Sequence, residues 1–257
     1  MEEPELNIIF KTYCKSVDFF PLIGSVLEQK QEGDVFFDQK SGAVLVIHKS
    51  RFAQILFCNN TIEEFQFIYN TIINENDYCG HPFDKIRFYN ASDGLIEFFT
   101  HEQNYFSHQV GERVRFYPKN IYQIVKLKEV IDAKKEVLSS LNKDHDLNVS
   151  NRFWKSEIDF LENSLSKCII EKNVVLSICY SAATSNNKAE IDVSTHINHR
   201  NKGLALKVCL SFVKLCNEKN IIPVWDCYAN NIGSMKTARS INFQEFRRYN
   251  FLILSKK

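Results

Sequence analysis

Three residues of one short turn, Arg200, Lys202 and Gly203, have the types and spacing that bind a phosphate group. The turn follows a run with strand character at 190–195 and leads into an amphipathic helix that begins at Leu204. The first turn of a helix has N–H groups without intrahelical partners and carries the positive end of the helix dipole. Glycine lets a loop backbone come close to an anion, and the two cations add full positive charge. The sequence therefore predicts a phosphate cradle.

The helix after this turn shows a clear apolar periodicity. Its apolar positions recur every three or four residues and predict one buried face, formed by Ala205, Val208, Cys209, Phe212, Val213 and Cys216. We expect the helix to end near Asn220, because asparagine tolerates the left-handed backbone of a C-terminal cap.

The segment from Arg200 to Ala205 resembles the Arg/Gln-x-x-Gly-x-Gly/Ala signature of the GNAT superfamily of N-acetyltransferases, whose loop holds the pyrophosphate of coenzyme A. The surrounding pieces follow the order of that family. They are the strand before the turn, a second strand at 223–228, the pattern Asn231-x-x-Ser234 opening another helix, and Asn242-Phe243 where Gly-Phe is usual. Upstream, Arg152-Phe153-Trp154-Lys155-Ser156 and Phe160-Leu161 resemble a two-part bacterial branch.

This resemblance implies a site for acetyl-coenzyme A as co-substrate. The pantetheine arm would pair with the main chain around Val193 and Thr195, and the phosphates would lie on the loop. The implied loop contacts are Arg200, Asn201, Lys202, Gly203, Leu204 and Ala205. Asn231 and Ser234 would face the pantetheine arm, although the same pair is also typical of an ordinary helix N-cap. Both interpretations stay open at this point.

The proton acceptor is less clear from the sequence. Glu190 and Asp192 share one face of the strand because side chains alternate along it. Some relatives in the resembled family use a carboxylate at the start of this strand as base, so Glu190 is the first candidate, against the alternative of an exposed strand-edge carboxylate. His196 and His199 flank the loop and could act as base or as phosphate contacts. No third ligand has suitable spacing, so we expect no metal.

One residue departs from the family pattern. Many relatives carry a tyrosine in the last helix that protonates the leaving thiolate, and this chain has Ala238 at the matching position. Tyr228 and Tyr249 are candidates to replace it, unless coenzyme A leaves as an unassisted thiolate.

Composition excludes some classes of partner. The formal net charge of +1 gives no general attraction to nucleic acid or to anionic membrane. No apolar run approaches the length of a membrane span, and the N-terminus lacks the pattern of a signal peptide. The eight cysteines lie mostly in apolar runs without C-x-x-C spacing, which predicts buried thiols in a reducing cytoplasm. A homo-oligomer is left open.

The element pattern predicts an α/β fold in two parts. We expect residues 126–257 to form a GNAT-like mixed sheet flanked by helices, with helices at 127–141 and 152–165 and a strand at 174–181. Residues 1–125 read as a smaller α/β domain, with a role in the acceptor cleft or in contacting a partner. It holds three short antiparallel strands (35–38, 43–48 and 52–58) and a helix opened by a Thr61–Glu64 capping box. No internal repeat has a fixed period.

These observations predict a bacterial, cytoplasmic N-acetyltransferase that transfers an acetyl group from acetyl-coenzyme A to the amine of a small molecule. The alternative is a non-catalytic protein that binds coenzyme A or acyl-coenzyme A as a sensor, which Ala238 favours.

Overall fold

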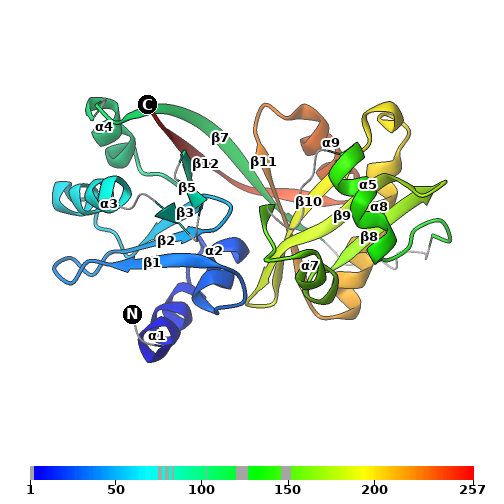
Figure 1. Cartoon of the computed structure of the whole chain (residues 1–257), viewed down its shortest axis with the longest axis horizontal. Coiled ribbons are helices and arrows are strands. Elements are labelled where there is room, and N and C mark those ends of the chain that lie inside the picture. The colour runs from blue at the N-terminus through cyan, green and yellow to red at the C-terminus, as the bar shows by residue number, and fades with distance from the viewer. Residues whose placement is uncertain are drawn as a thin grey trace. The chain divides into compact units, whose positions relative to one another are not determined.

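The computed structural model describes residues 3–74, 77–78, 81–82, 84–102, 104–119, 127–145 and 152–257. The chain divides into two compact units, here called the N-terminal unit (Met1–Arg113 with Arg248–Lys257) and the C-terminal unit (Val114–Arg247). Two long strands supply residues to both units: β7 (Phe106–Pro118) and β12 (Phe243–Lys256) (Figure 1). The domain boundary predicted at 125–126 lies outside the described residues, and the roles of the two predicted domains stay predictions.

The C-terminal unit is a mixed sheet with the strand order β8-β9-β10-β11-β7. Strands β8, β9 and β10 are antiparallel, whereas β10 and β11 are parallel. A parallel pair needs a crossover, and helix α8 supplies it. In chain order the elements are α5 (Lys135–Asp144), α7 (Glu157–Asn163), β8 (Ser166–Glu171), β9 (Val174–Ser185), β10 (Lys188–Thr195), the short helix η1 (Ile197–His199), α8 (Leu204–Glu218), β11 (Ile222–Tyr228) and α9 (Ile232–Ser240).

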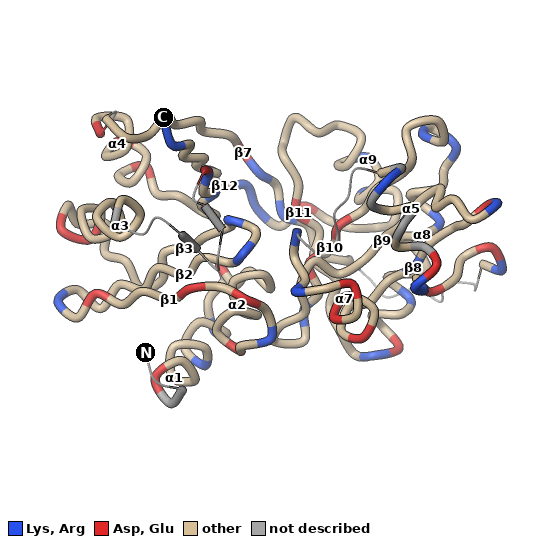
Figure 2. The backbone as a smooth tube through the Cα atoms, in the orientation of Figure 1, with Lys and Arg blue, Asp and Glu red and all other residues tan. Residues whose placement is uncertain are grey.

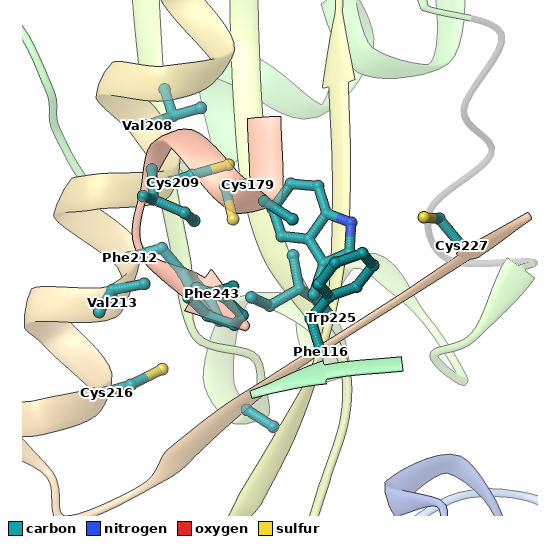
Figure 3. Close-up of a cluster of buried hydrophobic side chains, with 14 of the residues drawn as sticks. Phe116, Cys179, Val208, Cys209, Phe212, Val213, Cys216, Trp225, Cys227 and Phe243 are labelled. Carbon is teal, nitrogen blue, oxygen red and sulfur yellow. The ribbon is translucent and has the colours of Figure 1, made fainter. Parts of the chain in front are cut away.

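Helices cover both faces of this sheet. The predicted apolar face of α8 packs into the main core of the unit, where Figure 3 shows Cys179, Phe212 and Trp225 close together. Tyr180, the next residue of β9, faces the opposite side because side chains alternate, and its ring contacts Phe160 of α7. The sheet is thus a middle layer between α8 and the helices that precede β8.

The N-terminal unit has a similar succession of elements, with two additional short strands. After α1 (Glu3–Tyr13) and α2 (Pro21–Leu27) it has β1 (Gly33–Phe37), β2 (Val44–His48), β3 (Phe52–Leu56), α3 (Ile62–Asn74), the short strands β4 (Asp77–Tyr78) and β5 (His81–Pro82), β6 (Lys85–Phe88) and α4 (Asp93–His101). The order in its sheet is β1-β2-β3-β6-β12. As in the C-terminal unit, three antiparallel strands precede a helical crossover to a parallel strand.

This repeated topology was not visible in the sequence. The corresponding elements differ in length, since β3 has 5 residues and β10 has 8, while α3 has 13 and α8 has 15. Such differences leave no fixed period. The mixed α/β class and the sheet flanked by helices are confirmed.

Two predicted helices of the C-terminal unit begin later than the sequence indicated. Helix α5 starts at Lys135, because Ile131 upstream forms an isolated antiparallel bridge to Cys168. Helix α7 starts at Glu157, where the side chain of Ser156 accepts a hydrogen bond from the N–H of Asp159 and caps the helix.

The distribution of charges and the pairing of the cysteines bear on the predicted partners and compartment. Acidic and basic residues are interspersed over both units (Figure 2). All seven cysteines that the structure describes are unbridged thiols, and five of them are buried. Within the described residues no helix is long and apolar enough to cross a membrane.

Candidate functional site

The predicted phosphate turn connects β10 to α8 with two residues in the left-handed region. Asn201 has φ 61° and Gly203, the N-cap of α8, has φ 72°. A Cβ added at Gly203 would meet no atom within 4 Å, so the space beside the start of the helix is open. The first intrahelical hydrogen bond runs from the Lys207 N–H to the Gly203 carbonyl. The three N–H groups before Lys207 have no acceptor within the helix.

Two cations extend from this turn and are anchored to it. The Arg200 Nε donates to the Thr195 carbonyl at 3.4 Å, and the Lys202 Nζ donates to the Asn198 carbonyl at 3.2 Å. Both side chains are exposed. His196 opens the short helix η1, and its Nδ1 accepts from the Asn198 N–H at 3.2 Å. The turn therefore combines open N–H groups, left-handed backbone and positive charge, which suits a phosphate.

Strand β10 loses its parallel neighbour before it reaches the turn. In the described residues its pairing with β11 ends at Glu190 and Val224, although β10 continues to Thr195 and β11 to Tyr228. On its other side β10 stays paired with β9 as far as Thr195. After Glu190, the main-chain groups on the edge of β10 that faces β11 are therefore not paired with β11, and this stretch leads to the predicted phosphate turn. An extended amide chain can pair with such an edge.

Ala189 and Ile191 of β10 pack into the core beside α8. The other face of β10, which points away from α8, bears a row of polar side chains: Glu190, Asp192 and Ser194. Glu190 is 5% exposed. The Asp192 Oδ2 accepts from the Arg152 guanidinium at 3.0 Å and from the Tyr180 hydroxyl at 2.5 Å. Burial, together with the nearby Asp192 carboxylate, raises the pKa of Tyr180 well above its usual value. Tyr180 therefore stays a neutral donor to Asp192.

The end of this row contacts helix α5. His145, the C-cap of α5, places Nδ1 3.1 Å from the Ser194 hydroxyl and packs its ring edge-on against His196, with 5.7 Å between ring centroids. Sequence reasoning missed both His145 and the pairing of Arg152 with Asp192. Neither contact could have been read from spacing, because each joins residues about 40 or more positions apart.

Asn231 and Ser234 form the helix cap that the sequence allowed. The Asn231 side chain accepts from the Ser234 N–H at 3.0 Å, and Ser234 Oγ accepts from the Trp225 indole N–H at 3.0 Å. Trp225 belongs to β11, so the cap fixes the start of α9 against that strand. Their contact with pantetheine stays a prediction.

The three positions considered for the catalytic acid differ in surroundings. Ala238 is buried in the core of the C-terminal unit. Tyr228 is half-buried at the end of β11. Tyr249 belongs to the N-terminal unit, where its ring packs against Phe20 at 5.4 Å between centroids.

The sequence matches the GNAT acetyltransferase family over residues 21–252, which is most of the chain. The chain therefore belongs to the GNAT acetyltransferase family, and to the acyltransferase class of enzymes. An uncharacterized N-acetyltransferase of Bacillus subtilis strain 168, YdfB, is 32% identical over 97 residues, covering 38% of this chain and 37% of that protein. The match thus spans little more than a third of this relative's length.

Solved structures with the same fold cover nearly the whole chain. A GCN5-related N-acetyltransferase-like protein from Streptococcus suis 89/1591 has a TM-score of 0.73 at 15% identity and covers 100% of both chains. A GCN5-related N-acetyltransferase from Kribbella flavida has a TM-score of 0.58 at 11% identity, covering 97% of this chain and 95% of its own. At these identities the likeness concerns the fold alone.

Proposed function

We propose that this protein is an acetyl-coenzyme A dependent N-acetyltransferase that acts on an amine of a small molecule. The observation that carries the proposal is the open start of α8. Gly203 has a left-handed backbone and free space beside it, and Arg200 and Lys202 extend from the same turn. Family membership supplies the acyl-transfer class, and the finer assignment rests on this geometry.

The proposed coenzyme site runs along β10 and across the turn. The pyrophosphate is assigned to the N–H groups at Leu204 and Ala205 and to the charges of Arg200 and Lys202. Asn201 and Gly203 give the turn its shape. The pantetheine arm is assigned to the edge of β10 at Val193 and Thr195, beyond the last pair with β11. Asn231 and Ser234, at the start of α9, are assigned to the other side of the arm.

The proposed chemistry is direct transfer. The amine nitrogen attacks the thioester carbonyl, a C–N bond forms, the C–S bond breaks, and the amine proton passes to a base. Main-chain N–H groups of β10 would stabilise the carbonyl oxygen as negative charge develops on it. Coenzyme A leaves as the thiolate or takes its proton from Tyr228.

Glu190 is the proposed base, and His196 is the alternative. Glu190 lies at the last paired position of β10, where β10 and β11 stop pairing. Its burial would keep it out of bulk water, so the proton would reach it from a docked acceptor or through one water. His196 adjoins the phosphate turn and is half-exposed. Asp192 is not assigned this role, because its Oδ2 already accepts from Arg152 and Tyr180.

Acceptor, partners and location belong to the proposal as well. The near-neutral net charge of +1 favours a small amine over a polyanion or a basic tail. The unbridged thiols support a reducing compartment such as the bacterial cytoplasm.

The test combines binding and turnover on one sample. Calorimetric titration with acetyl-coenzyme A should show binding, and a thiol-release assay over a panel of amines should show release that depends on the amine. Gly203→Asp should weaken binding by roughly a hundredfold, since it puts bulk and negative charge at the phosphate. The matched control is Gly42→Asp, because Gly42 has φ 80° and equally open surroundings in the turn between β1 and β2.

Each result has a distinct meaning. Loss in Gly203→Asp with an unaffected Gly42→Asp supports the assignment, because both variants carry the same backbone strain. Unchanged affinity in folded Gly203→Asp would remove the phosphate site from this turn. Binding by the wild type without turnover on a broad amine panel would favour the sensor function.

A further inference from the structure

His145 connects helix α5 to the two strands that lead to the phosphate turn. Its Nε2 hydrogen-bonds to the Val175 carbonyl of β9, and its Nδ1 lies 3.1 Å from Ser194 Oγ of β10. Its ring packs against His196, which is the first residue after β10. One side chain thus contacts both strands and the start of the turn.

Val175 of β9 uses helix α5 as hydrogen-bond partner on the side where its pairing with β10 has ended. The pairing of β9 with β10 ends at Ser177 and Thr195, so Val175 lies past its last pair with β10. Helix α5 binds both main-chain groups of Val175: His145 takes the carbonyl, and Ser140 Oγ accepts from the N–H at 2.9 Å. Buried main-chain groups need such partners. Ser140 and His145 therefore both hold Val175 to α5, and His145 in addition contacts Ser194 of β10.

The contact with Ser194 leads onward to the turn. Ser177 Oγ donates to the Ser194 carbonyl at 3.1 Å and lies 2.9 Å from Thr195 Oγ1. The Thr195 carbonyl accepts from Arg200 Nε. These hydrogen bonds, joined through the covalent structure of Ser194 and Thr195, therefore link α5 to the end of β10 and to a cation of the turn. Because the Val175 carbonyl can only accept, the proton of a neutral His145 ring is on Nε2, and Nδ1 accepts from the Ser194 hydroxyl.

We propose that His145 is a positioning residue for coenzyme binding, which holds the end of β10 and the start of the phosphate turn in the geometry that fits the pyrophosphate. It acts through Ser194 and His196. The inference rests on the proposed function, since it concerns the same site. It predicts that His145 governs coenzyme affinity rather than the rate of the chemical step.

The experiment compares His145→Ala, Ser194→Ala and the double variant in the full chain. Affinity for coenzyme A is measured by calorimetry, and KM and kcat by thiol release. Each single variant should weaken coenzyme A binding by about three- to tenfold, the range of one net hydrogen bond. The double variant should be only slightly weaker than the singles, because both changes remove one link. The kcat at saturating coenzyme should stay within about twofold.

Ser140→Ala is the matched control, because it removes the other α5 contact to Val175 and keeps the contact of His145 with Ser194 of β10. It should lower the melting temperature without changing coenzyme affinity. Rescue adds a second readout. Asparagine at position 145 puts an amide near the place of Nδ1, where its oxygen can accept from the Ser194 hydroxyl, and glutamine puts one near that of Nε2, where its nitrogen can donate to the Val175 carbonyl. His145→Asn should recover much of the affinity, and His145→Gln should recover little.

The opposite pattern would overturn the inference. If Ser140→Ala weakened binding as much as His145→Ala, or if only His145→Gln restored it, His145 would be a helix anchor and no more. Coenzyme binding that is lost in Gly203→Asp but intact in the His145 and Ser194 variants would overturn this inference alone. A wild-type chain that does not bind coenzyme A would overturn the proposed function along with it.

Discussion

Each unit has a helical crossover between parallel strands, but the loop before the crossover helix binds a carboxylate of its own in the N-terminal unit and is open in the C-terminal unit. In the N-terminal unit residues 57–61 join β3 to α3, and the Glu64 carboxylate folds back on them. It accepts from the Asn59 N–H at 3.0 Å, from the Thr61 N–H at 2.9 Å and from the Cys58 thiol at 3.3 Å. In the C-terminal unit the third residue of the helix is Leu206, and the space beside Gly203 is open.

The difference shows what makes a helix start available to a ligand. Burial by itself would raise the pKa of Glu64, but the N–H groups of Asn59 and Thr61 outweigh it and lower that pKa. Burial also raises the pKa of the Cys58 thiol to about 11, so it acts as a neutral donor. The N-terminal loop thus already holds an anion of its own. With the N-terminal loop filled, the structure predicts one coenzyme site in each chain, at the C-terminal turn.

Removing the Glu64 carboxylate from the N-terminal loop should have the largest effect on stability. Glu64→Ala removes the acceptor of the Asn59 and Thr61 N–H groups and of the Cys58 thiol, and it breaks the capping box with Thr61. We expect a loss of roughly 3 kcal/mol in the free energy of unfolding, measured in urea. The control is Glu63→Ala, one position earlier and exposed, which should cost less than about 0.5 kcal/mol. Equal effects in the two variants would mean that the carboxylate does not organise the loop.

Removing the charges of Arg200 and Lys202 should weaken coenzyme A binding and leave folding intact. The double variant Arg200→Gln, Lys202→Gln should weaken coenzyme A binding by about tenfold at low salt, and the loss should shrink as salt rises. The control is Lys214→Gln, which removes a charge of α8 away from the turn and should bind coenzyme A like the wild type. A loss that does not depend on salt would argue against direct contact with the phosphates.

A smaller effect should appear in the pH dependence of stability. The lowered pKa means that folded Glu64 binds a proton more weakly than unfolded Glu64, so acid favours unfolding. Its contribution is fully present above the ordinary carboxyl pKa and is lost as the pH falls through the folded value. The difference in unfolding free energy between wild type and Glu64→Gln should therefore be largest near neutral pH and shrink in acid. A difference that is constant with pH would contradict this.

Local signals predicted much of this fold. The capping box at Thr61 and Glu64 and the Asn231 cap appear as expected, because each is made within one turn of helix. The start of α8 at Leu204 and the left-handed Asn220 also follow from glycine, asparagine and apolar spacing. The sequence therefore predicted where α8 begins and where its turn lies, whereas phosphate binding by that turn stays a prediction.

Tertiary contacts set what the sequence could not. The N-terminus of α5 depends on the bridge between Ile131 and Cys168, and the link from His145 to Ser194 depends on how α5 packs on the sheet. The end of pairing at Glu190 is a property of two strands together and has no signature in either. The capping box of Thr61 and Glu64 predicted the start of α3, but it did not predict that the Glu64 carboxylate also accepts from Asn59 and Cys58 in the loop before that helix.

The stoichiometry of coenzyme A binding tests the central claim most directly. Calorimetry on the wild-type chain should give one coenzyme per chain, and Gly203→Asp should weaken binding by roughly a hundredfold while Glu64→Gln leaves it unchanged. Two coenzymes per chain, or undiminished affinity in folded Gly203→Asp together with a loss in Glu64→Gln, would show that the N-terminal loop binds the ligand and would contradict the account.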